Sequence, residues 1–143
     1  TEDINHYIGE IYFLRATAYF DRLCTYGDFP IVTTVPEDKT EELVELSKRA
    51  PRNEVARFIL EDLDRAISLL KPGTAFNKVR IGKEMALLVK SRVALYEATF
   101  EKYHKGSGRR GRGDANWPGA KMAYNQGKTF NIEAEIDFSW TRP

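Results

Sequence analysis

The sequence predicts an all-α protein built from helical hairpins of the tetratricopeptide-like type, which stack into an α-α superhelix. Three long segments carry apolar residues at the three- and four-residue spacing of an amphipathic helix. No segment alternates apolar and polar residues convincingly enough to define a sheet. The pattern Leu63-x-x-Ala66 recurs 32 positions later as Leu95-x-x-Ala98. Tetratricopeptide repeats have a period of about 34 residues, so the recurrence favours stacked helix pairs.

The first helix is expected over residues 2–25. Its apolar stripe consists of Ile4, Ile8, Ile11, Tyr12, Ala16, Tyr19, Phe20 and Leu23. Gly27 and Pro30 follow, and both residue types are typical just beyond a helix C-terminus. Residues 31–35 are β-branched and predict a short extended segment. Residues 37–49 are polar and predict a loop with a partial turn of helix.

Two further helices are expected over residues 53–71 and 81–103, joined by a short turn. Asn53 is a competent N-cap for the first of them, and Pro72-Gly73 ends it. A short connection between two helices makes them an αα-hairpin. This hairpin is the core of the predicted fold.

The last part of the chain has a weaker pattern. Residues 105–118 are rich in glycine and arginine and predict a mobile basic loop. Residues 119–143 predict a weakly structured segment, in which Asn131 could cap one short helix through Phe138. The whole chain is therefore interpreted as one partial helical domain, residues 1–143.

Length, charge and cysteine content limit the classes of function that the chain can have. The 143 residues suit one domain or part of one, and the formal net charge of +1 offers no broad field for nucleic acid. The single cysteine, Cys24, allows no intrachain disulfide. No apolar run approaches the length of a membrane span. The chain begins inside a helical pattern, so we interpret it as a fragment or a processed form, with any export or anchoring signal outside it.

One literal motif and one basic cluster lie in the glycine-rich loop. Gly106-Ser-Gly108-Arg-Arg-Gly111 matches G-x-G-x-x-G, but it follows a helix rather than a strand, so we interpret it as a flexible loop. Arg109, Arg110 and Arg112 could grip phosphates. We expect solvated arginines instead, and no nucleic-acid partner.

Catalysis and metal binding are not expected. The residues that could ligate a metal are far apart in sequence: His6, Cys24 and His104. No metal-ligand spacing joins them, so no metal and no cofactor are predicted, and Cys24 is interpreted as a small core residue. Three carboxylates on the second helix point in different directions and have arginines nearby: Glu61, Asp62 and Asp64. General acid–base work needs a desolvated carboxylate in a cleft, so no enzyme is predicted.

Arg15 stands among aromatic and aliphatic residues of the first helix. Aromatic faces can bind the apolar side of a sugar, but rings pack helices against one another more often. An arginine stem can lie along such rings while its guanidinium meets a carboxylate. We therefore predict a structural ion pair of Arg15 with Asp64 or Asp28.

Several ordered motifs resemble the SusD/RagB type of outer-membrane nutrient-binding protein. Phe13-Leu-Arg-Ala16 is followed by Tyr19-Phe20 and by Tyr26-Gly-Asp-Phe-Pro30. The next two helices, Asn53-Glu-Val-x-x-Phe58 and Ala86-Leu-x-x-Lys-Ser-Arg-Val, resemble the family in the same order. The resemblance covers about residues 8–103. Family members are much longer than this chain, and no lipoprotein signal or anchoring cysteine is present in it.

The resemblance implies a tetratricopeptide-like helical fold and a non-catalytic, lipid-anchored protein on the outer face of the outer membrane. Such a protein captures oligosaccharides and passes them to a TonB-dependent, SusC-like transporter. The resemblance gives a structural rather than a ligand role to the motif residues: Arg15, Tyr26, Gly27, Asp28, Pro30 and Asp64. Glycan-contacting residues are not carried over. From their chemistry alone, Trp117 and Tyr124 are the best aromatic candidates for contacting a sugar.

Two alternatives stay open at this point. A tetratricopeptide-like module could instead bind a protein partner in its concave groove. A few helices taken from a larger array should also leave apolar surface exposed, so this chain is expected to self-associate.

Overall fold

The computed structural model describes residues 1–141, which form helices joined by loops, with no β-strand among them. The predicted all-α fold class is therefore confirmed. Five α-helices are present in this range: α1 (Glu2–Tyr26), α2 (Thr40–Leu46), α3 (Arg52–Leu69), α4 (Lys83–Tyr103) and α5 (Ile132–Thr141). Three short 3₁₀ turns cover Gly73–Phe76, Pro118–Lys121 and Ala123–Asn125.

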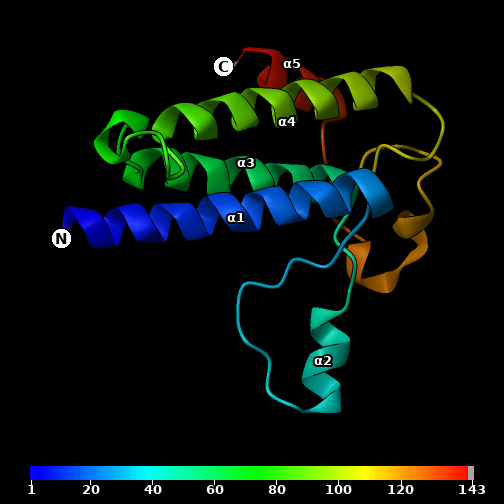
Figure 1. The fold of residues 1–143 in the computed structure, drawn as a ribbon. Helices are drawn as coiled ribbons and strands as arrows, with labels where there is room; N and C mark the ends of the chain where they lie inside the picture. The colour runs from blue at the N-terminus through cyan, green and yellow to red at the C-terminus, as the bar shows by residue number, and fades with distance from the viewer. Residues whose placement is uncertain (142–143) are drawn as a thin grey trace.

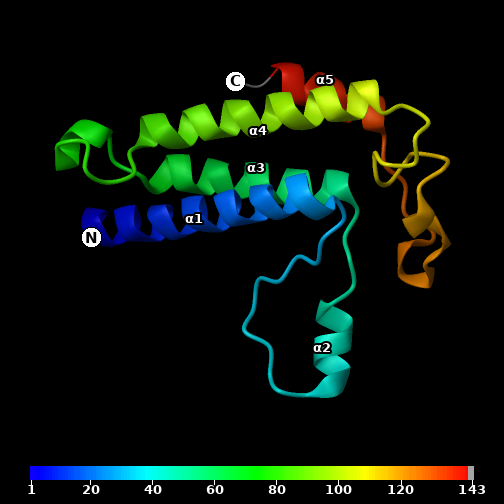
Figure 2. The same ribbon diagram turned by 45° about the vertical axis from the view of Figure 1, so that its right-hand side comes forward.

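Three long helices form the body of the molecule. α1, α3 and α4 run antiparallel to their neighbours, with α3 between the other two (Figure 1). α5 packs on α4, and α2 lies apart from the layer, between a long connection from α1 and a short one to α3 (Figure 2). The C-terminal end of α1, the start of α3 and the end of α4 lie at the same end of the body, beside the segment that links α4 to α5.

The core lies along α3, which is buried on both of its packed sides. Its fully buried apolar side chains are Val55, Ile59, Leu63 and Ala66. α1 contributes Phe13, Ala16 and Leu23, and α4 contributes Ala86 and Val93. Burying one such leucine or isoleucine contributes about 1.5–3 kcal/mol. α3 is therefore the element that joins the two outer helices.

The ends of the three long helices agree with the sequence prediction to within two residues, except that the cap of α3 differs. α1 ends at Tyr26, and Gly27 follows with φ 73°, a conformation that glycine adopts without a Cβ clash. α3 begins after Pro51, so the prediction that Asn53 is its N-cap is wrong. The Asp28 carboxylate, from the end of another helix, accepts the Arg52 N–H in place of a local cap (2.8 Å).

The N-terminal half of the predicted apolar stripe on α1 is wrong. Ile4, Ile8 and Ile11 are exposed, whereas His6 and Gly9 face the interior. Both sets satisfy the three- and four-residue spacing, so periodicity alone could not show which side faces α3. Gly9 decides the outcome, since a Cβ there would lie 3.1 Å from side-chain atoms at the end of α3.

Of the other local predictions, some are confirmed and some are wrong. The segment 119–143 was expected to be weakly structured, but residues 132–141 form α5, and residues 142–143 lie outside the described part. Asn131 does cap this helix, because its side-chain oxygen accepts the Ala134 N–H at 3.2 Å. Cys24, expected in the core, is exposed. Within residues 1–141 the extended segment after Pro30 makes no strand pair, and the single β-bridge joins Phe29 to Ala50.

The exposed apolar stripe of α1 has a measurable consequence. It consists of Ile4, Ile8, Ile11 and Leu14. We expect the isolated 143-residue chain to self-associate, because a contiguous apolar helix face gains free energy when it leaves water. Sedimentation velocity over a concentration series should show reversible association. Ile4→Gln, Ile8→Gln and Ile11→Gln together should yield a monomer, and Val35→Gln, an exposed loop control, should not. A monomeric wild-type chain at every concentration would contradict the expectation.

A polar junction and a cleft at the helix ends

Asp28 joins three segments at the end of the helical layer. One carboxylate oxygen accepts the Arg52 N–H at the start of α3 (2.8 Å), and the other accepts the Trp117 indole N–H (2.7 Å). The neighbouring Phe29 exchanges two backbone hydrogen bonds of 3.1 Å with Ala50. The turn after α1 therefore fixes both the start of α3 and the segment that follows α4.

A buried ion pair joins α3 to α4 next to this turn. The Arg52 guanidinium donates three hydrogen bonds of 2.8–3.0 Å to the Glu97 carboxylate. Both side chains are almost inaccessible to solvent. The guanidinium carbon also lies 3.5 Å from the centre of the Phe100 ring, a cation–π distance. Pairing and stacking together satisfy a charge that burial would otherwise make costly.

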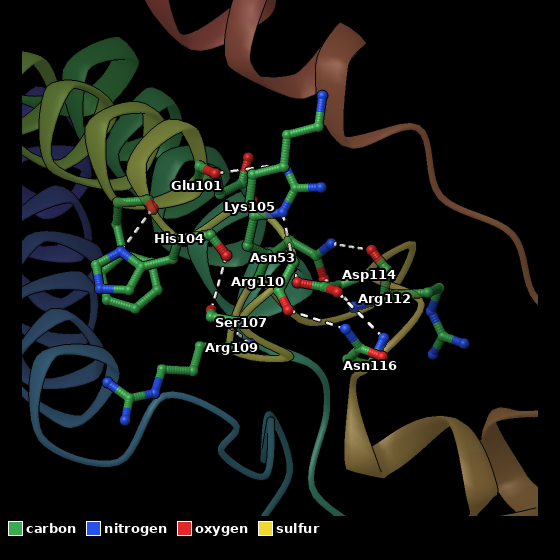
Figure 3. A network of polar contacts seen from close by, with 12 residues as sticks. Asn53, Glu101, His104, Lys105, Ser107, Arg109, Arg110, Arg112, Asp114 and Asn116 are labelled. Carbon is green, nitrogen blue, oxygen red and sulfur yellow. Dashed lines mark hydrogen bonds and ion pairs between the residues drawn. The ribbon is translucent and has the colours of Figure 1, made fainter.

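The glycine-rich segment is held by a second polar network (Figure 3). The Asn53 side chain donates to the Arg112 carbonyl at 2.7 Å. The Arg112 guanidinium in turn donates to Glu54 (2.5 Å) and to two oxygens of Asn125 (3.0 Å each). Gly111 makes this approach possible, because it has φ 82° and a Cβ there would lie 2.9 Å from the Asn53 side-chain oxygen.

The prediction that the basic loop is solvated is wrong for two of its three arginines. Arg110 and Arg112 are only 7% and 4% exposed. Arg110 lies between the Glu101 carbonyl (3.3 Å) and the Asp114 carboxylate (3.5 Å). Only Arg109 of the three is exposed. The acidic residue four positions after Arg110 was the one signal in the sequence that could have indicated this pairing.

The two aromatic residues expected to contact a sugar lie in different environments. Trp117 is only 6% exposed. Its ring is packed against Gly119, where a Cβ would come within 2.2 Å of the indole. Tyr124 is partly exposed, and the Lys48 ammonium lies 5.6 Å from its ring centre. A glycan contact by either residue stays a prediction, and the covered Trp117 ring offers little surface for stacking.

Arg15 makes a structural ion pair, but with a partner that the sequence did not indicate. It donates to both oxygens of Asp62, at 2.6 and 2.8 Å, and its guanidinium carbon lies 5.3 and 5.1 Å from the ring centres of Tyr12 and Phe58. These bonds raise the pKa of Arg15. Asp64 instead pairs with Lys90 (2.8 Å). Two residues along a helix amount to about 200°, so Asp62 faces α1 and Asp64 faces α4.

Glu101 is the least satisfied charged group in this region. It is fully buried on α4, and neither of its carboxylate oxygens has a hydrogen-bond partner within the described residues. Burial, together with the nearby charges of Glu97 and Glu135, raises its pKa to about 9, although Arg52 and Arg110 oppose the shift. Glu101 is therefore protonated at neutral pH.

Two clefts open near the turn after α1. An apolar one of about 470 Å³ lies between α1 and the α2 region and is lined by Tyr19, Phe29 and Leu43. A polar one of about 390 Å³ lies between the turn itself and the glycine-rich segment. Within residues 1–141 no three His, Cys, Asp or Glu side chains come together as a metal site would require. In the same range, none of the helices combines the length and the apolarity of a membrane span.

Antiparallel helix pairs stacked through α3 place the chain in the class of tetratricopeptide-like helical proteins. A family described as "Starch-binding associating with outer membrane" matches residues 1–95. The chain therefore belongs to this SusD-like family, whose members are glycan-binding proteins associated with the outer membrane.

Two relatives agree with this assignment. The chain is 29% identical over 99 residues to the SusD-like protein P2 of Formosa agariphila. The crystal structure of a SusD-like protein from Bacteroides fragilis is similar over 71% of the chain, with a TM-score of 0.58 and 32% identity. The match covers 69% of this chain but only 19% of the Formosa protein, and likewise 19% of the Bacteroides one. The chain thus corresponds to about one fifth of the length of either relative.

The Arg15–Asp62 pair predicts a stability defect rather than a binding defect. Arg15→Ala should lower the free energy of unfolding by about 2–3 kcal/mol, because among the described residues it leaves the buried Asp62 with only Arg65 as a partner. Urea denaturation measures the change, and Arg92→Ala on the exposed side of α4 is the control. A variant that keeps full stability but loses glycan binding would instead make Arg15 a ligand residue.

The raised pKa of Glu101 predicts a pH dependence of stability. An unfolded glutamate releases its proton near pH 4.5, whereas the folded state keeps it to about pH 9. Folding therefore takes up a proton between these values, and stability falls as the pH rises, by up to about 1.4 kcal/mol per unit.

Replacing the carboxyl should remove this dependence. Glu101→Gln stays neutral at every pH, so its denaturation midpoint should change less between pH 5 and 9 than that of the wild type. Glu41→Gln, at an exposed position on α2, should leave the slope unchanged. Equal slopes in the wild type and Glu101→Gln would contradict the assignment.

Proposed function

We propose that this chain is part of a cell-surface protein that captures oligosaccharides for uptake through the outer membrane. The observation that carries the proposal is the family match over residues 1–95, since that family is described by starch binding at the outer membrane. In this proposal the whole protein is lipid-anchored on the outer face of the membrane. It hands its ligand to a TonB-dependent transporter of the SusC-like type.

The proposed role is binding without catalysis. Three buried carboxylates that could serve as acids or bases are tied into structural contacts or sealed from solvent. Asp62 and Glu97 each accept hydrogen bonds from an arginine, and Glu101 has no access to a cleft ligand because it is fully buried. His6 is likewise buried, and its Nδ1 accepts the Lys71 N–H at 3.1 Å. These placements support a scaffold that presents a ligand surface.

A second candidate function is a protein–protein interaction module. The exposed apolar stripe of α1 favours it, because helical-hairpin proteins use such faces for partner helices. The two candidates differ in what they require. Glycan capture needs a sugar ligand, whereas an interaction module needs only a partner polypeptide.

Glycan capture is tested on the whole protein that carries this chain. We expect binding to at least one oligosaccharide class on a glycan array, with no change in the sugar's chain length after prolonged incubation. The transporter should co-purify from outer membranes solubilised in mild detergent. A heat-denatured sample controls for nonspecific adsorption. Binding to no glycan would contradict the proposal, and hydrolysis of a bound glycan would contradict its non-catalytic part.

A further inference from the structure

The polar cleft of about 390 Å³ lies directly at the turn that ends α1. Its walls come from this turn, from the residues just before α3 and from the glycine-rich segment after α4. Small-molecule sites typically measure about 300–1,000 Å³ and combine apolar walls with a few convergent polar groups. The cleft fits this description, because it contains both aromatic rings and guanidinium groups.

The charge of the cleft is positive. Three arginines line it, Arg49, Arg52 and Arg109, against one carboxylate, Asp28. Both oxygens of that carboxylate accept hydrogen bonds, one from the Arg52 backbone N–H and one from the Trp117 indole N–H, and within residues 1–141 it forms no ion pair with Arg49 or Arg109. Asp28 and Glu97, the buried partner of Arg52, offset two of the three positive charges, which leaves a net charge of +1.

Two of these arginines differ from the other arginines around the junction. Arg52, Arg110 and Arg112 are buried and bound to acceptors within the protein. The side chains of Arg49 and Arg109 are exposed, and neither has an ion pair or hydrogen bond within residues 1–141. Figure 3 shows Arg109 pointing away from the network that holds its neighbours. Unpaired guanidiniums on one cleft are suited to bind an acid group with bidentate hydrogen bonds.

An aromatic surface stands beside these charges. Tyr26 lines the cleft and is 55% exposed. One face of its ring stacks on Phe29, with 6.0 Å between ring centres and an angle of 23°. This contact holds the ring in place and leaves its outer part open. Aromatic rings bind the apolar side of sugar rings, whereas a free phosphate or a simple carboxylate would have no use for one.

We propose that this cleft binds an anionic sugar residue of the captured oligosaccharide. Arg49 and Arg109 hold the acid group, either a uronate carboxylate or a sulfate ester, and Tyr26 packs against the sugar ring. The inference rests on the proposed function, because it names the substrate class and the residues that select it. Nucleic acid is a less suitable ligand, because Arg110 and Arg112 are buried. They are two of the four Lys and Arg side chains in residues 105–118.

The test is isothermal titration calorimetry on the whole protein with three tetrasaccharides. They are a carboxylated probe (tetragalacturonate), a sulfated probe (a carrageenan tetrasaccharide) and a neutral probe (maltotetraose). We expect at least one acidic probe to bind more tightly than the neutral one, with an affinity that falls as sodium chloride is raised. Whichever acidic probe binds identifies the acid group.

Matched variants assign the binding to the cleft. The double variant Arg49→Gln with Arg109→Gln should weaken the acidic probe by about tenfold or more, because it removes two charge-assisted contacts. Tyr26→Ala should weaken it as well. Arg92→Gln, at an exposed position on α4 away from the cleft, should leave the affinity unchanged. The thermal midpoints of the two Gln variants should equal that of the wild type, because neither substitution disturbs a buried contact.

Several outcomes would overturn the inference. The inference is wrong if the neutral probe binds more tightly than both acidic probes, if neither acidic probe binds, or if the double variant keeps its affinity. None of these results contradicts glycan capture itself. Competition by poly-glutamate as strong as by the acidic sugar would replace the sugar with an acidic peptide as ligand. Failure of the whole protein to bind any glycan on an array would end both proposals.

Discussion

The junction at the helix ends depends on the carboxylate of Asp28. It lies just beyond the C-terminus of α1 and faces the N-terminus of α3, where unpaired N–H groups and the helix dipole favour a negative charge. Its second oxygen holds the indole of Trp117. A single side chain thus positions the first turn of α3 and the segment between α4 and α5. Without it, the Arg52 and Trp117 N–H groups would lose their partners at once.

Ion pairs with a buried carboxylate lie on both sides of α3. Arg15–Asp62 joins α3 to α1, and Arg52–Glu97 joins it to α4. Such pairs add little net stability compared with apolar replacements, but a mispaired helix would leave a buried charge without a partner. Their effect is therefore to disfavour other rotations and registers of the helices. Arg15 and Arg52 are therefore structural, whereas Arg49 and Arg109 line the cleft with no side-chain partner in the described part of the chain.

The sequence predicted where the helices begin and end better than it predicted which residues contact one another. Apolar spacing and Gly27 placed the ends of α1 to within one residue, since both signals are local. The side of α1 that faces α3 was not predictable, because two stripes fit the same period and the close approach at Gly9 appears only in three dimensions. The burial of Arg112 and Trp117 depends on Asn53 and Asp28, which lie about 60 and 90 residues away in the chain. No local pattern carries such information.

The turn after α1 connects the scaffold with the proposed ligand site. Gly27, with its positive φ, reverses the chain there, and a Cβ at this position would lie 3.7 Å from Nη1 of Arg52 on the cleft. The floor of the cleft thus comes from residues that the fold needs. Its charged rim comes from Arg49 and Arg109, which make no side-chain hydrogen bond or ion pair within residues 1–141. Substitution of Arg49 or Arg109 can therefore alter which sugar is bound without weakening the contacts between the helices.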